Sequence, residues 1–152
     1  MMKTGNRIKT RILNTGDDSK IIIIRVIVGL IFIIEGVLKY KMVQWLGPGR
    51  FTEIGFSYAF FWAYFTGAVE IFCGLLVLAG LFTRLSSVPL LIIMIAAFIT
   101  TKLPLLGTEG FWIFSHEYGI DFSLTLLLIL LIIYGGGKWS LDLKLLQSDR
   151  AG

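Results

Sequence analysis

Residues 56–82 read FSYAFFWAYFTGAVEIFCGLLVLAGLF, an apolar run that is long enough to cross a bilayer. One ionisable side chain, Glu70, lies near the centre of this run. Placing a charge at that depth costs about 2.5–3.5 kcal/mol on insertion scales, so such a residue must face protein or water, hold a proton or have a partner. The run therefore predicts a membrane-spanning helix, and Glu70 is the first candidate for a functional residue.

Three further apolar runs accompany this one: Ile21–Leu38, Leu85–Thr101 and Ile120–Tyr134. The chain is 56% hydrophobic and 16% charged, with a mean hydropathy of +0.83, whereas soluble domains are about 45–50% apolar and about 25% charged. We expect an all-α integral membrane protein, an antiparallel bundle of four transmembrane helices with no soluble catalytic module. Its parts would be a basic N-terminal segment (1–20), the transmembrane domain (21–137) and an amphipathic C-terminal tail (138–152).

Basic residues are unequally shared between the two faces of such a bundle. Nine lie on one face (Lys3, Arg7, Lys9, Arg11, Lys20, Arg84, Lys138, Lys144 and Arg150) and four on the other (Lys39, Lys41, Arg50 and Lys102). Because cytoplasmic loops are enriched in Lys and Arg, both termini are expected in the cytoplasm. The long basic N-terminal region has no A-x-A cleavage site after it, so we expect the first span to be retained.

Cys73 and His116 are the single cysteine and the single histidine of the sequence. An internal disulfide, a bis-histidine haem and a structural zinc site are therefore excluded within the chain. The net charge of +4 does not indicate nucleic-acid binding, because the basic residues adjoin the spans. Redox chemistry would need a bound organic cofactor or a redox centre in a partner protein.

The depths of the polar residues predict which of them share a level of the membrane. At 1.5 Å per helical residue, Glu35 lies about 21 Å and Glu70 about 18 Å from the cytoplasmic end of their spans. Lys39 lies higher, at about 27 Å, and Arg25 lower, at about 6 Å, from where it would reach Glu70 only by extending upward or through water. Lys102 belongs to the upper level.

These depths favour one ligand site in the outer half of the bundle. The predicted ligand-binding residues are Glu70, Glu35, Lys39, Arg25 and Lys102, with Phe32, Phe65 and Phe72 as apolar walls. Two close carboxyls cannot both ionise comfortably, so one would hold a proton. Glu70 and Glu35 are thus candidates for proton handling with a quinone. In the alternative, Glu35 pairs with Lys39 and Glu70 only joins helices.

Other patterns concern packing and connections. Gly29 and Gly36 share one face of the first span, and Gly74 flanks Glu70 on the second, so these helices are expected to approach closely. Pro104 should end the third span, and the following segment to Tyr118 would lie in the interface or re-enter the membrane. Ser140 should cap a short C-terminal helix, with Asp142 near its start.

The chain resembles the DoxX family of small four-helix membrane proteins over about residues 25–142. Three groups of residues carry the resemblance, and each is quoted with its spacing. They are Arg25-x3-Gly29-x2-Phe32-x3-Gly36-x2-Lys39, then Glu70-x3-Gly74 leading into Leu78-Ala79-Gly80-Leu81-Phe82-Thr83-Arg84, and finally Gly135-x-Gly137-x2-Ser140-Leu141-Asp142.

The resemblance implies a multi-pass protein of the bacterial inner membrane. Some members of the family are subunits of thiosulfate:quinone oxidoreductase, and others are associated with redox-defence complexes. We therefore expect an oxidoreductase subunit that binds a quinone or other apolar ligand and is not catalytic alone; a non-catalytic assembly protein is the alternative. A transporter is disfavoured because we find no repeat. Expected partners are membrane lipids, soluble redox proteins or further copies of the chain.

Overall fold

A computed structural model describes residues 18–151, and in this part of the chain the regular structure is entirely helical. The long helices are α2 (Ile21–Lys41), α4 (Ala59–Ala79), α5 (Thr83–Ala97) and α7 (Phe111–Tyr134). The shorter ones are α3 (Pro48–Glu53), the π-helical segment η1 (Phe98–Lys102), α6 (Leu103–Thr108) and α8 (Leu141–Ala151). The all-α prediction is confirmed. Most of the predicted basic N-terminal segment, residues 1–17, lies outside the described residues.

The described residues contain four helical stretches that are long and apolar enough to cross a membrane, as predicted. The third runs over Thr83–Thr108 and is longer than expected, because α5, η1 and α6 follow one another without a break. The prediction that Pro104 ends this span is wrong. In η1 the Leu103 N–H donates to the Phe98 carbonyl, five residues back. Such a widened turn accommodates Pro104, which has no backbone N–H donor.

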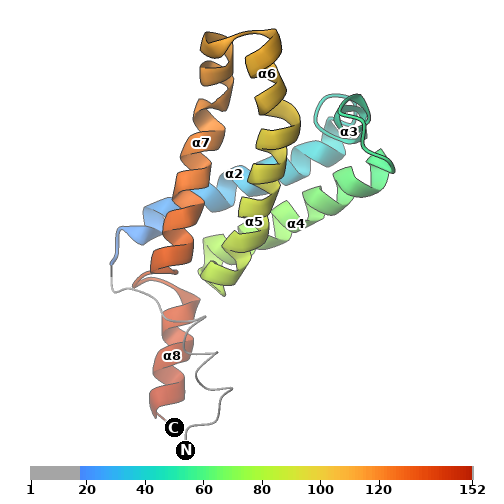
Figure 1. Ribbon diagram of the computed structural model, residues 1–152. Coiled ribbons are helices and arrows are strands. Elements are labelled where there is room, and N and C mark those ends of the chain that lie inside the picture. The colour runs from blue at the N-terminus through green and yellow to red at the C-terminus, as the bar shows by residue number, and fades with distance from the viewer. Residues whose placement is uncertain (1–17, 152) are drawn as a thin grey trace, which may run out of the picture.

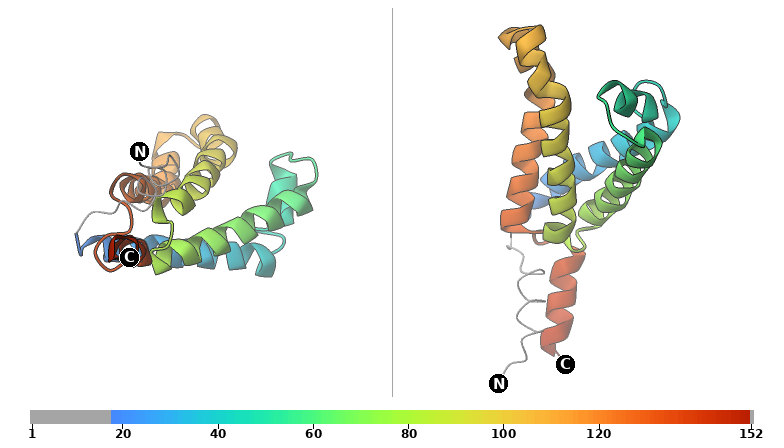
Figure 2. Two further views of the ribbon diagram at one scale, coloured as in Figure 1. Left: turned by 90° about the horizontal axis from the view of Figure 1, so that it is seen from below. Right: turned by 45° about the vertical axis from the view of Figure 1, so that its right-hand side comes forward.

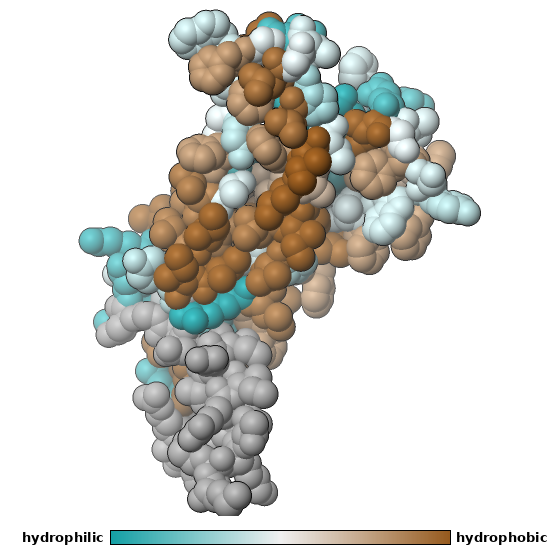
Figure 3. Space-filling model, viewed as in Figure 1, coloured by the Kyte–Doolittle hydropathy of each residue, from teal (hydrophilic) through white to brown (hydrophobic). Residues whose placement is uncertain are grey.

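The four spans form two antiparallel hairpins, α2 with α4 and α5 with α7 (Figure 1). The hairpins meet near α8 and diverge toward the ends that carry α3 and α6, as both views of Figure 2 show. At their junction Val28, Val77, Leu90 and Leu128 are fully buried. Apolar side chains cover the middle of the outer surface of α5 and α7 (Figure 3), as expected for a surface that faces lipid.

Two pairs of glycines allow α2 and α4 to pack closely. A Cβ atom added to Gly29 would lie 2.9 Å from the Gly74 carbonyl oxygen, and one added to Gly36 would lie 2.7 Å from that of Gly67. Without side chains at these positions the two backbones come into contact, which is how small residues join membrane helices. Polar side chains on α2 and α4 are thereby brought within reach of one another.

The segment that follows Pro104 is helical on both sides of a single turn. It forms α6 and the first two turns of α7, which begins at Phe111 and not near Ile120. Gly110, with φ +84°, makes the turn between them. The Phe98 and Tyr118 rings, whose centroids lie 4.7 Å apart, pack this extension against η1. The α5–α7 hairpin is consequently the longer of the two.

Candidate functional site

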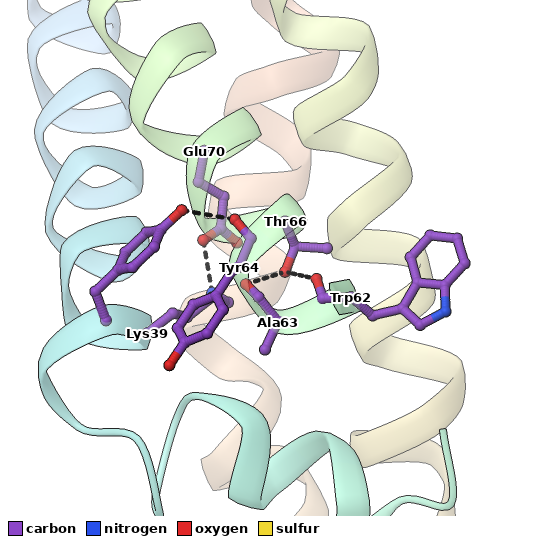
Figure 4. Close-up of polar contacts among 7 residues, drawn as sticks. Lys39, Trp62, Ala63, Tyr64, Thr66 and Glu70 are labelled. Carbon is purple, nitrogen blue, oxygen red and sulfur yellow. Dashed lines mark hydrogen bonds and ion pairs between the residues drawn. The ribbon is translucent and has the colours of Figure 1, made fainter. Parts of the chain in front are cut away.

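A buried ion pair joins the two helices of the first hairpin. Lys39 Nζ, in the last turn of α2, donates to Glu70 Oε2 in the middle of α4 at 2.6 Å (Figure 4). The side chains of Lys39 and Glu70 are 13% and 4% exposed. Lys39 thus forms its ion pair across the helix interface, with Glu70, and not along α2 with Glu35. Glu35 is half-buried and close enough for its charge to act on Glu70.

Aromatic side chains of α2 and α4 lie next to the pair. Tyr40 Oη donates to the Tyr64 carbonyl at 2.7 Å, and the two rings stack with centroids 5.1 Å apart. The absence of a side chain at Gly67 makes room for the Tyr40 ring, since an added Cβ would lie 2.9 Å from it. Thr66 Oγ1 donates to the carbonyls of Trp62 and Ala63 (Figure 4). The contacts of Tyr40 hold the last turn of α2, which carries Lys39, against α4.

The pair has the chemistry of a hydrogen-bonding and proton-exchange site. Lys39 offers N–H donors, while Glu70 accepts as a carboxylate and donates when it holds a proton. A second carboxyl group, that of Glu35, is close enough to act on Glu70 electrostatically. A buried ion pair is stable only while both partners remain, because removing one leaves an uncompensated charge in a low dielectric.

Lys102 lies in a second polar cluster, on the other hairpin. Its Nζ donates to the Glu117 carbonyl at 3.0 Å and lies 3.4 Å from Glu117 Oε2 and 3.7 Å from Asp121 Oδ2. The prediction that Lys102 shares a site with Glu70 is therefore not met, because the hairpins diverge at this level (Figure 1). The sequence places Asp121 at the same depth but gives no sign that it takes Lys102 as its partner.

Arg25 is also placed away from Glu70. Its Nε donates to the Val77 carbonyl at 3.0 Å and its Nη2 to that of Leu78 at 2.7 Å. Its Nη1 donates to the carbonyls of Gly136 at 3.0 Å and Trp139 at 2.8 Å. The last carbonyls of a helix have no partner within it, and here one guanidinium satisfies the end of α4 together with the segment after α7. Arg25 is a structural residue.

Asp142 completes this end of the molecule. It is 1% exposed, and its two carboxylate oxygens accept from the N–H groups of Phe82 at 2.6 Å and Thr83 at 3.0 Å. Its own N–H donates to the Gly80 carbonyl at 2.9 Å. Asp142 therefore caps α5, about sixty residues away in sequence, in addition to lying in the first turn of α8. We call Arg25, Gly80, Gly136 and Asp142 the C-terminal lock.

The remaining motif residues support the lock. Ser140 caps α8 as predicted, since its Oγ accepts from the Leu143 N–H at 3.2 Å. Gly135 and Gly137 have φ +77° and +75° and form the turn after α7. Arg84 donates to the Ile133 carbonyl at 2.7 Å and fastens α5 to the end of α7.

The predicted apolar walls are not around Glu70. Phe32 is buried in the core, but Phe65 and Phe72 are 51% and 64% exposed and point outward. An open cavity of about 520 Å³ lies between α2 and α7, and Glu70 is not among its lining residues. Of the five predicted ligand-binding residues, the structure brings together Lys39, Glu70 and Glu35.

Comparison with known proteins adds four findings. The family model described as DoxX matches residues 21–103. An uncharacterized membrane protein of Mycobacterium tuberculosis is 47% identical over 141 residues, which cover 89% of this chain and 86% of that protein. A Bacillus subtilis protein, CatD, whose name proposes an oxidoreductase, is 30% identical over 146 residues, or 92% of this chain and 97% of that protein. No solved structure matches the chain.

Proposed function

The chain belongs to the DoxX family of membrane proteins, and from that premise we propose that it is the membrane subunit of an oxidoreductase system. In this proposal the Lys39–Glu70 pair binds the polar head of a quinone or another apolar carbonyl ligand. The observation that carries it is an ion pair inside the membrane whose carboxylate is 4% exposed. The name of the B. subtilis relative supports the redox context, and only that.

The ligand would approach from the Lys39 side, where 13% of the side chain is exposed. A ligand carbonyl would accept from Lys39 Nζ, and Glu70, released from Lys39 and protonated by water, would donate to the ligand. Lys39 and Glu70 thus supply the two donors that a quinone head needs, and the electrons would come from a partner protein.

A second candidate function is supported by the same geometry. Lys39 and Glu70 bind each other, and Arg25 and Asp142 of the C-terminal lock bind backbone groups of the chain. Buried charges that join helices in this way suit a non-catalytic assembly role, in which the exposed surface holds partner proteins together. The two functions differ in what they require of Glu70.

The variant Glu70→Gln tests which function applies. An amide side chain still accepts from Lys39, and Glu35 remains nearby to balance the ammonium charge, so the fold should persist. The amide N–H is a weaker donor to the ligand than a protonated carboxyl group and cannot exchange a proton. We expect quinone retained by the purified protein, measured by mass spectrometry of extracted small molecules, to fall about two- to tenfold, since a neutral hydrogen bond contributes about 0.5–1.5 kcal/mol. Asp121→Asn, the same chemical change in the other hairpin, should leave quinone retention unchanged.

The alternative outcome is equally informative. If Glu70→Gln unfolds in detergent while Asp121→Asn does not, Glu70 is a structural partner of Lys39 and the assembly function stands. Unfolding is followed by the loss of a single symmetric peak in size-exclusion chromatography, which does not depend on any ligand.

We also propose that both termini lie in the cytoplasm of a bacterial cell, with the protein in the inner membrane. The helices α6 and α8 lie at opposite ends of the molecule (Figure 1), and they contain Thr108 and Ser148. A cysteine at position 108 should react with an impermeant maleimide added to intact spheroplasts, and one at 148 only after lysis. Native Cys73 is buried and serves as the unreactive background. Labelling of 148 but not of 108 would reverse the orientation.

A further inference from the structure

The second polar cluster, formed by Lys102, Glu117 and Asp121, has no role in the proposed function. One ammonium group, Lys102, faces two carboxylates, Glu117 and Asp121, so the cluster carries an excess negative charge. Lys102 lies closer to the carbonyl of Glu117 than to its carboxylate, at 3.0 Å against 3.4 Å. The Glu117 side chain is 51% exposed. Its carboxylate is therefore exposed enough to accept from a second, external cation in addition to Lys102.

Glu117 is also part of the wall of the cavity between α2 and α7. Its neighbour His116 lies beside it in this wall, and Leu124, Leu127 and Ile31 line the part further along the helices. Glu117 and Leu127 are separated by about 15 Å along α7, at 1.5 Å per residue. The cavity thus has polar groups at the end near the start of α7 and hydrocarbon side chains at the end nearer the middle of the membrane.

We propose that this cavity binds an amphiphile that has a primary ammonium head group and a hydrocarbon tail, such as phosphatidylethanolamine. Its ammonium group donates to the Glu117 carboxylate, and its tail lies along α7 toward Leu127 and Ile31. The volume of about 520 Å³ is within the range of about 300–1,000 Å³ that is usual for ligand sites. The excess negative charge of the cluster disfavours an anionic head. The site is separate from Lys39 and Glu70 and does not depend on the proposed function.

Gly119 provides a variant that closes the cavity without disturbing the fold. It is one of the lining residues, and a Cβ atom added to it would meet nothing within 4 Å. Gly119→Leu therefore fills the cavity with a side chain that suits a helix. Gly107 in α6 is the matched control, since an added Cβ there also meets nothing and the residue does not line the cavity.

Native mass spectrometry of the purified protein, titrated with phosphatidylethanolamine or phosphatidylglycerol, tests the proposal. We expect phosphatidylethanolamine to be retained at least about tenfold better, Gly119→Leu to lose it, and Gly107→Leu to bind as the parent protein does. Glu117→Gln should bring the two lipids to similar retention, because it removes the charge that selects the ammonium group. Equal retention of both lipids by the parent protein would overturn the proposal, as would unchanged retention by Gly119→Leu. So would full competition by phosphoethanolamine without a tail, which would indicate a site for soluble amines.

Discussion

Arg25→Met is expected to abolish the stable fold of the protein. The substitution removes the donors of four carbonyls, those of Val77, Leu78, Gly136 and Trp139. A buried polar group that loses its partner costs about 1–3 kcal/mol. Since native proteins are stable by only about 5–15 kcal/mol, losing four donors at once would remove a large part of that free energy. We expect aggregation during extraction, or a fall in the midpoint of thermal unfolding in detergent too large to leave a folded population at 37 °C.

Arg84→Met is the matched control for this variant. Arg84 also donates to a carbonyl, but its hydrogen bond is to Ile133 in an exposed position. We expect its cost to be about 1 kcal/mol. The stability of Arg25→Lys should lie between those of Arg25→Met and Arg84→Met, because one ammonium group cannot reach all the carbonyls that a planar guanidinium spans. If Arg25→Met is no less stable than Arg84→Met, the C-terminal lock does not hold the hairpins together.

Gly36→Leu is expected to separate α2 from α4. Even the Cβ atom would lie 2.7 Å from both the Gly67 carbonyl oxygen and Ile71 Cγ1, so the helices cannot keep their present distance. Lys39, one turn further along α2, would move away from Glu70. Overpacking costs about 1–3 kcal/mol, and breaking a buried ion pair by removing a partner costs about 3–5 kcal/mol. The midpoint of thermal unfolding should therefore fall steeply.

Alanine substitutions at two glycines should change the stability of the protein in different directions, depending on whether the position is crowded. Alanine stabilises an unhindered helix interior by about 0.5–1 kcal/mol relative to glycine. Gly107→Ala, where an added Cβ meets nothing, should therefore be neutral or stabilising, and Gly36→Ala should destabilise. Thermal unfolding of both variants is measured in the same detergent. If both substitutions shift the midpoint in the same direction, the close approach of α2 and α4 is contradicted.

The sequence predicts the spans well because their length and apolar composition are local properties. It also predicts that Glu70, Glu35 and Lys39 lie near one another, since their depths follow from helical rise alone. The partner of Lys39 does not follow from depth. It depends on the glycine contacts between α2 and α4, which turn Lys39 toward Glu70.

The errors have a common physical origin in relations between distant elements. The hairpins diverge, and this separates Lys102 from Glu70. The divergence depends on the angles at which the helices cross, and the depth of a residue in its span contains no information about those angles. The acceptors of Arg25 are backbone carbonyls, which have no signature in the sequence of side chains. The sequence predicts that Asp142 lies near the start of the C-terminal helix, and only the folded chain shows that it also caps α5. Spacing within one span could not have predicted either contact.

The C-terminal lock also has a consequence for the order of events during biosynthesis. Arg25 and its acceptor Gly136 are 111 residues apart. At about 5–20 residues per second, the ribosome makes Gly136 roughly 6–20 s after Arg25. Near the end of that interval the first three spans have been made, but two acceptors of the guanidinium and the cap of α5 do not yet exist. The nascent protein therefore lacks the contacts that close this end until its last residues emerge. A chain that stops before Gly136 leaves the Arg25 guanidinium with the Val77 and Leu78 carbonyls alone as acceptors.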